Sequence, residues 1–280
     1  MLTYETESSL QLNRNSEMFY VVGVDVGRYG ANSVIVVLKV EPRAKAWKKK
    51  LVYIEVIHGE NFLFQVPKIK RVIKNFNPRE IVIDGNGLGA GLIDSMVMDT
   101  YDPKTGEFFP AYYVFNDPKY LPKGYKNPPN KSIPEDNILI YNLKANASND
   151  SEINSNCYSQ IMGGMVDFLA NERIVKTKLL STEFGRKMTP YDRQAFLYPY
   201  IMTSRLMDEL NNLKLKPTGV QNQIKIERIS KTIEKDRYSA LAYALYRVKE
   251  YEDNALRKVK KHKTLGNYVF SSNRRKWLTF

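Results

Sequence analysis

Three aspartates in this sequence stand where apolar segments end or begin. Asp25 and Asp84 each close a β-branched run, and Asp236 opens an alanine-rich one. A carboxylate at the end of a buried strand is costly unless it is paired or bound to a cation. Taken singly, each aspartate also has an ordinary structural interpretation, as a turn former, an Asx-turn or a charge at a helix N-terminus.

Together the three aspartates predict a metal site. Functional groups gather at strand ends in α/β sheets, and a late helix packed on the sheet would bring its first turn to the same edge. Converging carboxylates repel one another without cations, and hard divalent ions with oxygen ligands, Mg²⁺ or Mn²⁺, resolve that repulsion. Two such ions on shared carboxylates are suited to phosphodiester hydrolysis.

The segments around Asp25 and Asp84 predict a mixed sheet. Residues 20–25, 33–40 and 51–57 are rich in β-branched residues and joined by short turns, which predicts a three-stranded antiparallel meander. Residues 64–76 have apolar side chains at helical spacing and precede the strand 80–84, so that strand follows a crossover and is expected to be parallel. A second helix is expected at 88–98.

The remainder of the chain predicts further elements of one mixed α/β domain. The expected elements are a strand at 112–115, a surface loop at 117–130, a strand at 137–141, a helix at 151–171, an extended segment at 173–176, a helix at 192–213, an edge strand at 220–229 and a helix beginning near Lys235. There is no internal repeat and no composition break that would divide the core.

The residue composition limits the kinds of catalytic and metal site that the chain can form. The 280 residues include one cysteine, Cys157, and two histidines, His58 and His262. A single cysteine excludes an internal disulfide. Two histidines nearly exclude a histidine-based triad or a Cys/His zinc site, so any hydrolysis would have to use carboxylates. No apolar run is long enough to span a bilayer, and the polar first 18 residues do not form a signal peptide.

The chain is basic, with 43 Lys and Arg against 30 Asp and Glu and a net charge of +13. This balance favours a polyanionic partner such as DNA, although a lysine-rich surface alone would also produce it. Arg186, Lys187, Lys231 and Arg237 are the candidates for phosphate contacts, because they are close in sequence to the expected acidic edge. The basic segment 254–280 is expected to be a disordered tail or an electrostatic tether.

Three motifs in this order resemble one nuclease family. Val-Gly-Val-Asp-Val-Gly around Asp25, Ile-Val-Ile-Asp-Gly-Asn-Gly-Leu-Gly around Asp84 and Lys-Asp-Arg-Tyr-Ser-Ala-Leu-Ala around Asp236 are similar to motifs of the RNase H-like superfamily. Within it they resemble the nuclease domain of bacteriophage terminase large subunits. The resemblance implies an RNase H-like sheet, with an antiparallel meander continued by parallel strands and flanked by helices.

The same resemblance implies a function. It suggests an endonuclease that uses Mg²⁺ or Mn²⁺, two ions in all, to cut concatemeric double-stranded viral DNA during packaging, with Asp25, Asp84 and Asp236 as catalytic metal ligands. The implied partners are a packaging ATPase, a small terminase subunit and a portal, in the cytoplasm of the host cell. Neither secretion nor a membrane partner is expected.

Two positions depart from the family pattern. Many relatives carry an acid where this chain has Asn32, and a second where it has Lys235. No Gly-x-x-x-x-Gly-Lys-Ser/Thr loop occurs, so the chain is not expected to be the packaging motor. We expect a leader or linker at residues 1–18, a nuclease domain at 19–253 and a basic tail at 254–280.

Other readings of the sequence remain open. A Holliday-junction resolvase of the same superfamily would carry similar acids, and a non-catalytic basic DNA-binding module would carry structural aspartates. The actin-like sugar kinases also begin with an Asp-x-Gly hairpin, but they need a second phosphate-binding half that this motif set does not provide.

Overall fold

The computed structural model describes residues 17–27, 30–43, 46–120, 134–217 and 224–274, with side chains described up to residue 257 apart from a few positions. The predicted meander is confirmed. Strand β1 (Phe19–Asp25) pairs antiparallel with β2 (Asn32–Glu41), which pairs antiparallel with β3 (Lys48–His58). Its β-branched residues are buried on both faces of the sheet, which explains their near-continuous apolar runs.

The parallel half of the sheet lies on the other side of β1. Strand β4 (Glu80–Asp84) pairs parallel with β1, and β8 (Ile138–Leu143) pairs parallel with β4. The short strands β7 (Tyr113–Val114) and β9 (Val166–Asp167) close the two edges. The order of the seven strands is β7-β8-β4-β1-β2-β3-β9.

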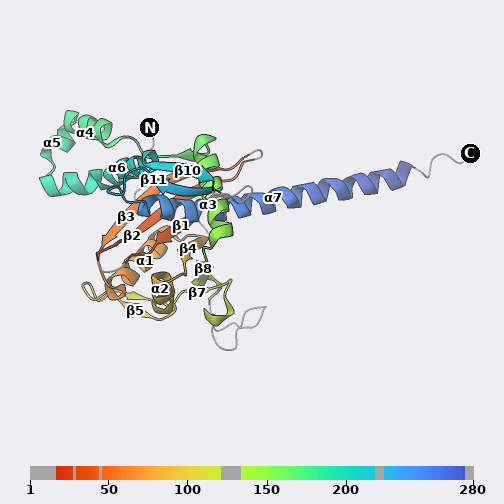
Figure 1. The fold of residues 1–280 in the computed structure, drawn as a ribbon, viewed down its shortest axis with the longest axis horizontal. Coiled ribbons are helices and arrows are strands. Elements are labelled where there is room, and N and C mark those ends of the chain that lie inside the picture. Colours follow the sequence, from red (N-terminus) through yellow and green to blue (C-terminus); the bar gives the residue numbers. More distant parts are fainter. Residues whose placement is uncertain (1–16, 28–29, 44–45, 121–133, 218–223, 275–280) are drawn as a thin grey trace, which may run out of the picture.

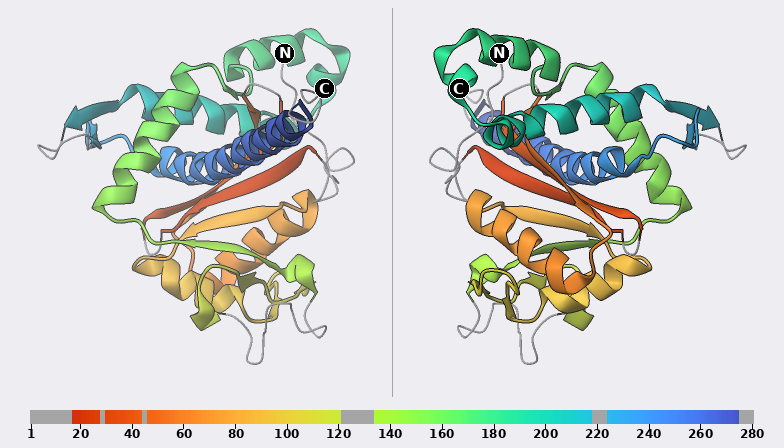
Figure 2. Two further views of the ribbon diagram at one scale, coloured as in Figure 1. Left: turned by 90° about the vertical axis from the view of Figure 1, so that its right-hand side faces the viewer. Right: turned by 90° about the vertical axis from the view of Figure 1, so that its left-hand side faces the viewer.

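Helices cover both faces of this sheet (Figures 1 and 2). Helices α1 (Phe62–Phe76) and α2 (Leu88–Met96) pack on one face, against a core that includes Val22 and Val24. Helix α7 (Asp236–Arg274) packs on the other face with α3 (Ala147–Met162), against Val21 and residues of β2. The result is a helix–sheet–helix sandwich in which the long α7 runs across the meander.

A second, smaller core lies beside the sandwich. Helices α4 (Glu172–Ser181), α5 (Glu183–Lys187) and the first half of α6 (Pro190–Asn211) enclose Leu169, Val175, Leu179, Leu197 and Tyr200. We call α4, α5 and residues 190–197 of α6 the helical lobe. It projects beyond the sheet in Figure 1, above the end of β3.

The structure corrects the predicted helix 151–171 and the predicted extended segment 173–176. Helix α3 ends at Met162, because Gly164 adopts a left-handed conformation (φ 65°) that terminates it. The segment 173–176 lies inside α4, which Asn171 caps by accepting a hydrogen bond from the Arg173 amide at 3.0 Å. Ile174 and Val175 are β-branched and locally favour extended structure, but both lie in helix α4.

The strand predicted at 220–229 is present in the described residues as β11 (Ile224–Arg228). It pairs with β10 (Leu213–Pro217) in a separate two-stranded sheet and not at an edge of the main sheet. A third small sheet pairs β5 (Thr100–Tyr101) with β6 (Phe108–Phe109) on either side of a turn that begins at Asp102.

The two ends of the chain and the loop predicted at 117–130 are described only in part. The expected leader lies mostly outside the described residues, as does most of the loop predicted at 117–130, apart from the 3-10 turn Pro118–Tyr120. A further 3-10 turn, Glu135–Asn137, precedes β8. The basic segment from residue 254 continues α7 as a helix to Arg274, where a disordered tail was expected. No helix in the described part of the chain is long and apolar enough to cross a membrane.

Candidate metal centre

Asp25 and Asp84 leave the sheet side by side. Val24 of β1 pairs with Ile83 of β4 in parallel register, and each aspartate is the next residue on its strand. Both carboxylates are half-buried. The parallel pairing therefore delivers two acids to one edge of the sheet, as their positions in the sequence predict.

Helix α7 brings the third aspartate to this region because Gly23 lets it approach β1 closely. A Cβ atom on Gly23 would lie 2.0 Å from the backbone oxygen of Ala240 and 3.1 Å from Cβ of Ala244. Only a glycine in the strand permits such contact with the helix backbone. Asp236 lies one helical turn before Ala240 and begins α7 at the end of β1 that carries Asp25.

The three carboxylates interact electrostatically. Burial raises the pKa of Asp25 to about 7, and the negative charges of Asp236 and Asp84 add to this rise, while Lys235 opposes it. Burial also raises the pKa of Asp236, with a further contribution from the charge of Glu234. The edge is thus a place where negative charge is destabilised unless a cation is present.

Asp84 is held by neighbouring donors. The amide of Asn86 donates to its Oδ1 at 3.1 Å, and the backbone of Ala145 and the side chain of Tyr243 also hydrogen-bond to the carboxylate. Burial raises the pKa of Asp84, and these donors lower it. Tyr243 comes from α7, so the helix that carries Asp236 also orients Asp84. This role of Tyr243 could not be predicted from the sequence, because tyrosines are abundant throughout the chain.

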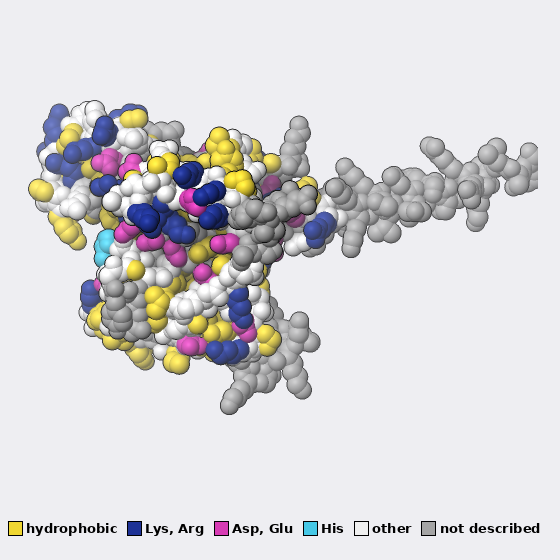
Figure 3. All heavy atoms as spheres, viewed as in Figure 1, with side chains coloured by type: hydrophobic (Ala, Val, Ile, Leu, Met, Phe, Trp, Pro, Cys, Tyr) yellow, Lys and Arg dark blue, Asp and Glu magenta, His cyan; other side chains and the backbone are white. Residues whose placement is uncertain are grey.

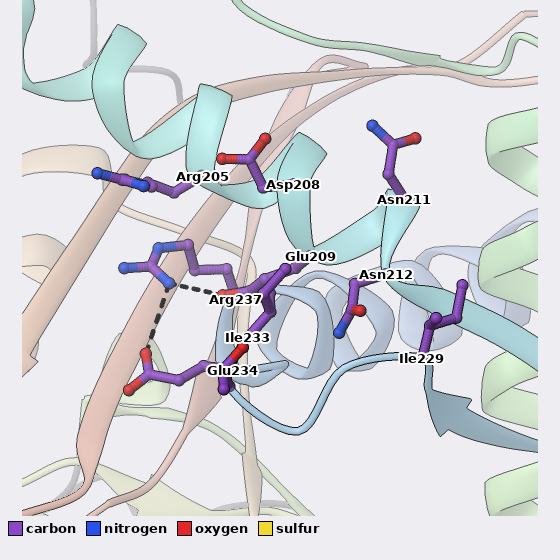
Figure 4. A pocket seen from close by; sticks show the side chains of 10 residues that line it. Arg205, Asp208, Glu209, Asn211, Asn212, Ile229, Ile233, Glu234 and Arg237 are labelled. Atoms are coloured by element: carbon purple, nitrogen blue, oxygen red, sulfur yellow. Dashed lines mark hydrogen bonds and ion pairs between the residues drawn. The ribbon is translucent and has the colours of Figure 1, made fainter.

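The start of α7 is tied down on both sides of Asp236. Glu209 of α6 accepts hydrogen bonds from Arg237 Nη1 at 2.6 Å and from the amide of Tyr238 at 2.9 Å. On the other side, Glu234 accepts a hydrogen bond from Asn32 Nδ2 of β2 at 2.8 Å. Figure 4 shows Arg237 between Glu209 and Glu234. Asn32, a departure from the family pattern, therefore makes a contact that fixes the loop before Asp236.

Carboxylate oxygens are donors that a hard divalent cation prefers, but the carboxylates at this edge do not form a ready-made ligand set. Within the described residues, no three His, Cys, Asp or Glu side chains stand in an arrangement that could already hold a metal ion. The charges of Asp236 and Asp84 raise the pKa of Asp25, so a cation at this edge would relieve that repulsion.

The four basic candidates have different surroundings. Arg186 and Lys187 lie on α5 of the helical lobe and are exposed, as is Lys231 in the loop before α7. In Figure 3 basic side chains are numerous around α4 and α5, where acidic and hydrophobic side chains are interspersed. Arg237 is buried, 9% exposed, and paired with Glu209, so its role in this structure is to anchor α7.

A cleft of about 600 Å³ adjoins the start of α7. Its lining residues include Arg205, Asp208, Asn212, Ile229 and Glu234, so the cleft carries side chains of both charges (Figure 4). Asn212 closes one side by binding the backbone of Ser230, donating to its oxygen at 2.8 Å and accepting from its amide at 2.7 Å. These bonds hold the loop that leads to Asp236.

The strand order and directions define the fold class. An antiparallel meander β1-β2-β3, parallel strands β4 and β8 added beside β1, and helices on both faces constitute an RNase H-like fold. The predicted fold class is confirmed.

Comparison with known proteins identifies terminase nucleases as structures that this chain resembles. Neither a protein-family model nor a curated protein sequence matches the chain. Among solved structures, the large terminase nuclease from thermophilic phage G20c is 15% identical, with 87% of this chain and 91% of that chain covered and a TM-score of 0.49. The magnesium-bound form of that nuclease is also 15% identical, with 88% of this chain and 90% of that chain covered and a TM-score of 0.48. The large terminase nuclease domain of Thermus phage P74-26 is 15% identical, with 87% of this chain and 88% of that chain covered and a TM-score of 0.46.

Proposed function

We propose that this chain is a divalent-metal-dependent endonuclease that cleaves double-stranded DNA, acting on concatemeric viral DNA during genome packaging. The observation that carries the proposal is that Asp25 and Asp84 end adjacent parallel strands of an RNase H-like sheet, where burial and the negative charges of Asp236 and Asp84 raise the pKa of Asp25 to about 7. The net charge of +13 supports a polyanionic substrate.

In this proposal the three aspartates hold Mg²⁺ or Mn²⁺, two ions in all. When bound, such ions lower the pKa of a water molecule and stabilise the charge on the leaving oxygen of a phosphodiester. The protein's own contribution is to place the ligands. The β1–β4 pairing aligns Asp25 with Asp84, Tyr243 orients Asp84, and Glu209 and Asn32 fix the start of α7 around Asp236.

The DNA backbone would be bound by exposed cations near this edge. Arg186 and Lys187 on the helical lobe and Lys231 on the loop before α7 are the candidates. Arg186 forms no ion pair with any residue in the described part of the chain, and Lys187 is paired only with the exposed Glu183 at 2.6 Å. Phosphates can therefore replace weak surface interactions there. Arg237 is not available without breaking its buried contact with Glu209.

The biological setting follows from the family resemblance. A nuclease of this kind would act with a packaging ATPase, a small terminase subunit and a portal, in the cytoplasm of the host cell. These partners are part of the proposal and would be sought by co-purification from infected cells.

The test is cleavage of supercoiled plasmid by purified protein with Mn²⁺ or Mg²⁺. Wild-type protein should convert the plasmid to nicked and linear forms, and Asp25→Ala, Asp84→Ala and Asp236→Ala should each abolish cutting while the far-UV circular dichroism and DNA affinity are retained. Asp94→Ala is the matched control, because Asp94 is an exposed aspartate of α2. It should cut at the wild-type rate.

Two outcomes would redirect the proposal. Tight, salt-sensitive DNA binding without cleavage under any divalent metal would favour the non-catalytic DNA-binding module. A strong preference for four-way junctions over linear duplex would favour the resolvase reading. An aspartate whose alanine variant cuts normally would be removed from the site.

A further inference from the structure

A chain of three polar side chains lies at the same edge of the sheet, and one of them, His58, has no role in the site described above. Asn32 opens β2 and His58 ends β3, and the two are cross-strand partners. His58 Nδ1 lies 2.7 Å from Asn32 Oδ1, and Asn32 Nδ2 lies 2.8 Å from Glu234 Oε2. Residues from three distant parts of the sequence thus form one continuous hydrogen-bonded array.

The donors and acceptors in this array fix the state of the imidazole. The amide nitrogen of Asn32 donates to Glu234, so the amide oxygen of Asn32 faces His58. An amide oxygen only accepts, so Nδ1 of His58 carries the hydrogen. In a neutral imidazole with hydrogen on Nδ1, Nε2 holds the free lone pair. The array therefore orients His58 with a proton acceptor on its outer nitrogen.

The array reaches the candidate metal centre through Glu234. Glu234 lies two residues before Asp236, and its charge raises the pKa of that aspartate. At the other end, His58 is exposed at the tip of β3, two strands away from the end of β1 that carries Asp25. His58 is the only histidine whose side chain the structure describes. An accessible base thus stands at the rim of the acidic edge.

We propose that His58 is a further functional residue of this edge, a general base that contacts the attacking water, with Asn32 and Glu234 as positioning residues. The proposal rests on the nuclease function proposed above. As the water oxygen forms its bond to phosphorus, its proton passes to Nε2 of His58. The P–O3′ bond breaks, and the 3′ oxygen leaves with the bonding electron pair and takes a proton from solvent. His58 then releases its proton to solvent, and the products carry a 5′ phosphate and a 3′ hydroxyl.

The three acids leave this role open. If Asp25, Asp84 and Asp236 hold cations, their oxygens are committed as ligands and are poor proton acceptors. A neutral imidazole with a free lone pair on Nε2 can accept a proton that acids bound to cations cannot accept. In many active sites a third group holds the catalytic base in one tautomer, and the hydrogen bond from His58 to Asn32 would do the same here.

The test uses the full chain and compares three variants in single-turnover cleavage at saturating DNA and Mn²⁺. His58→Ala removes the base, His58→Asn keeps a donor near the position of Nδ1 but lacks Nε2, and Asn32→Leu breaks the array. We expect the two His58 variants to lose about 10²-fold or more in rate. Asn32→Leu should lose less, because the imidazole remains. DNA affinity measured with Ca²⁺ and the melting temperature should stay near wild type for His58→Ala.

Chemical rescue distinguishes a base from a structural residue. Added imidazole should restore part of the rate of His58→Ala and leave wild type and Lys74→Ala, a control on the exposed face of α1, unchanged. A His58→Ala protein that cuts at the wild-type rate, or one that imidazole does not rescue, would overturn the inference while leaving the nuclease function intact. A wild-type protein that cuts no DNA with any divalent metal would overturn both.

Discussion

Val24 and Ile83 are parallel partners on neighbouring strands, and this pairing decides where Asp25 and Asp84 lie. Each aspartate follows its partner residue directly, so the two carboxylates leave the sheet together. Burial and the charges of Asp236 and Asp84 then raise the pKa of Asp25 to about 7. The metal-free protein therefore carries an electrostatic cost at this edge, and that cost is measurable.

The first prediction concerns Asp25→Asn in metal-free protein. A carboxyl whose pKa is raised in the folded state loses stability as pH rises between its unfolded value, near 4, and its folded value, about 7. Above pH 7 the whole cost is present, and Asn removes it. In EDTA at pH 8 we expect Asp25→Asn to have an unfolding free energy greater than that of wild type by up to a few kcal/mol. Its melting temperature should be higher as a result.

The same variant should lose the response to metal. Mn²⁺ should raise the melting temperature of wild type, because cation binding to the folded state stabilises it, and should leave Asp25→Asn nearly unchanged. Asp94→Asn serves as the control and should behave as wild type in both measurements. A destabilised Asp25→Asn in EDTA would contradict the electrostatic account of this edge.

Much of the sheet could be predicted because the same residues favour strands locally and fill the core between sheet and helices. The β-branched runs ending at Asp25 and Asp84 specify strands, and the helical spacing between them requires a crossover, so parallel pairing follows. The placement of Asp236 needed one more fact, the close approach of α7 to Gly23. A glycine in a strand indicates such an approach but does not say which element makes it.

The errors lie where short-range signals conflict with packing. Ile174 and Val175 favour a strand, but Val175 and Leu179 fill the small core of the helical lobe at helical spacing. The array of His58, Asn32 and Glu234 was beyond sequence reasoning, because it joins positions that are up to 202 residues apart. Among these, Asn32 alone gave a signal, as an expected acid that is absent.

The second prediction tests the contact between β1 and α7. Gly23→Ala would place Cβ 2.0 Å from the backbone oxygen of Ala240, so the helix must move away from the strand. We expect a loss of about 1–3 kcal/mol in unfolding free energy, measured by denaturant titration. Because Asp236 moves with α7, the affinity for Mn²⁺ measured by calorimetry should also fall.

Val22→Ala is the matched control for this effect. Val22 is fully buried on the opposite face of β1, toward α1 and α2, so its truncation destabilises the fold without displacing α7. Below its melting temperature it should bind Mn²⁺ as wild type does. Equal losses of metal affinity in the two variants would show that stability alone, and not the position of the helix, governs the site.

The third prediction concerns Lys70, a buried lysine of α1. Its Nζ donates to the backbone oxygen of Met98 at 2.5 Å and to Thr100 Oγ1 at 3.1 Å. Burial lowers its pKa to about 8, against a weaker opposing effect of Asp99. The folded state therefore binds fewer protons than the unfolded state between pH 8 and about 10.4, and stability from this group should rise with pH across that window.

Replacing Lys70 should remove this rise. Below pH 8 the full cost of burying the charged amine is present, so Lys70→Met should be more stable than wild type at pH 7, by at most a few kcal/mol. Lys74→Met, on an exposed lysine of the same helix that pairs with Glu107, is the control and should keep the rise. Denaturant titrations at pH 7, 8.5 and 10 measure it, and an unchanged slope in Lys70→Met would contradict the assignment.

The fourth prediction separates DNA contacts from structural contacts among the basic candidates. The double variant Arg186→Ser/Lys187→Ser removes two exposed cations from the helical lobe and should leave the unfolding free energy within about 0.5 kcal/mol of wild type. Its affinity for duplex DNA, measured with Ca²⁺ to prevent cutting, should fall. The salt dependence of binding should weaken by up to about two units of slope, since about 0.9 is lost per phosphate contact.

Arg237→Leu should behave in the opposite way. The arginine is buried against Glu209, so its loss leaves an unpaired carboxylate whose pKa burial already raises. We expect a loss of about 3–5 kcal/mol in unfolding free energy. Adding Glu209→Gln should recover part of that loss, because the second change removes the uncompensated charge. An Arg186→Ser/Lys187→Ser protein that binds DNA with unchanged affinity and salt slope would move the DNA path away from the helical lobe.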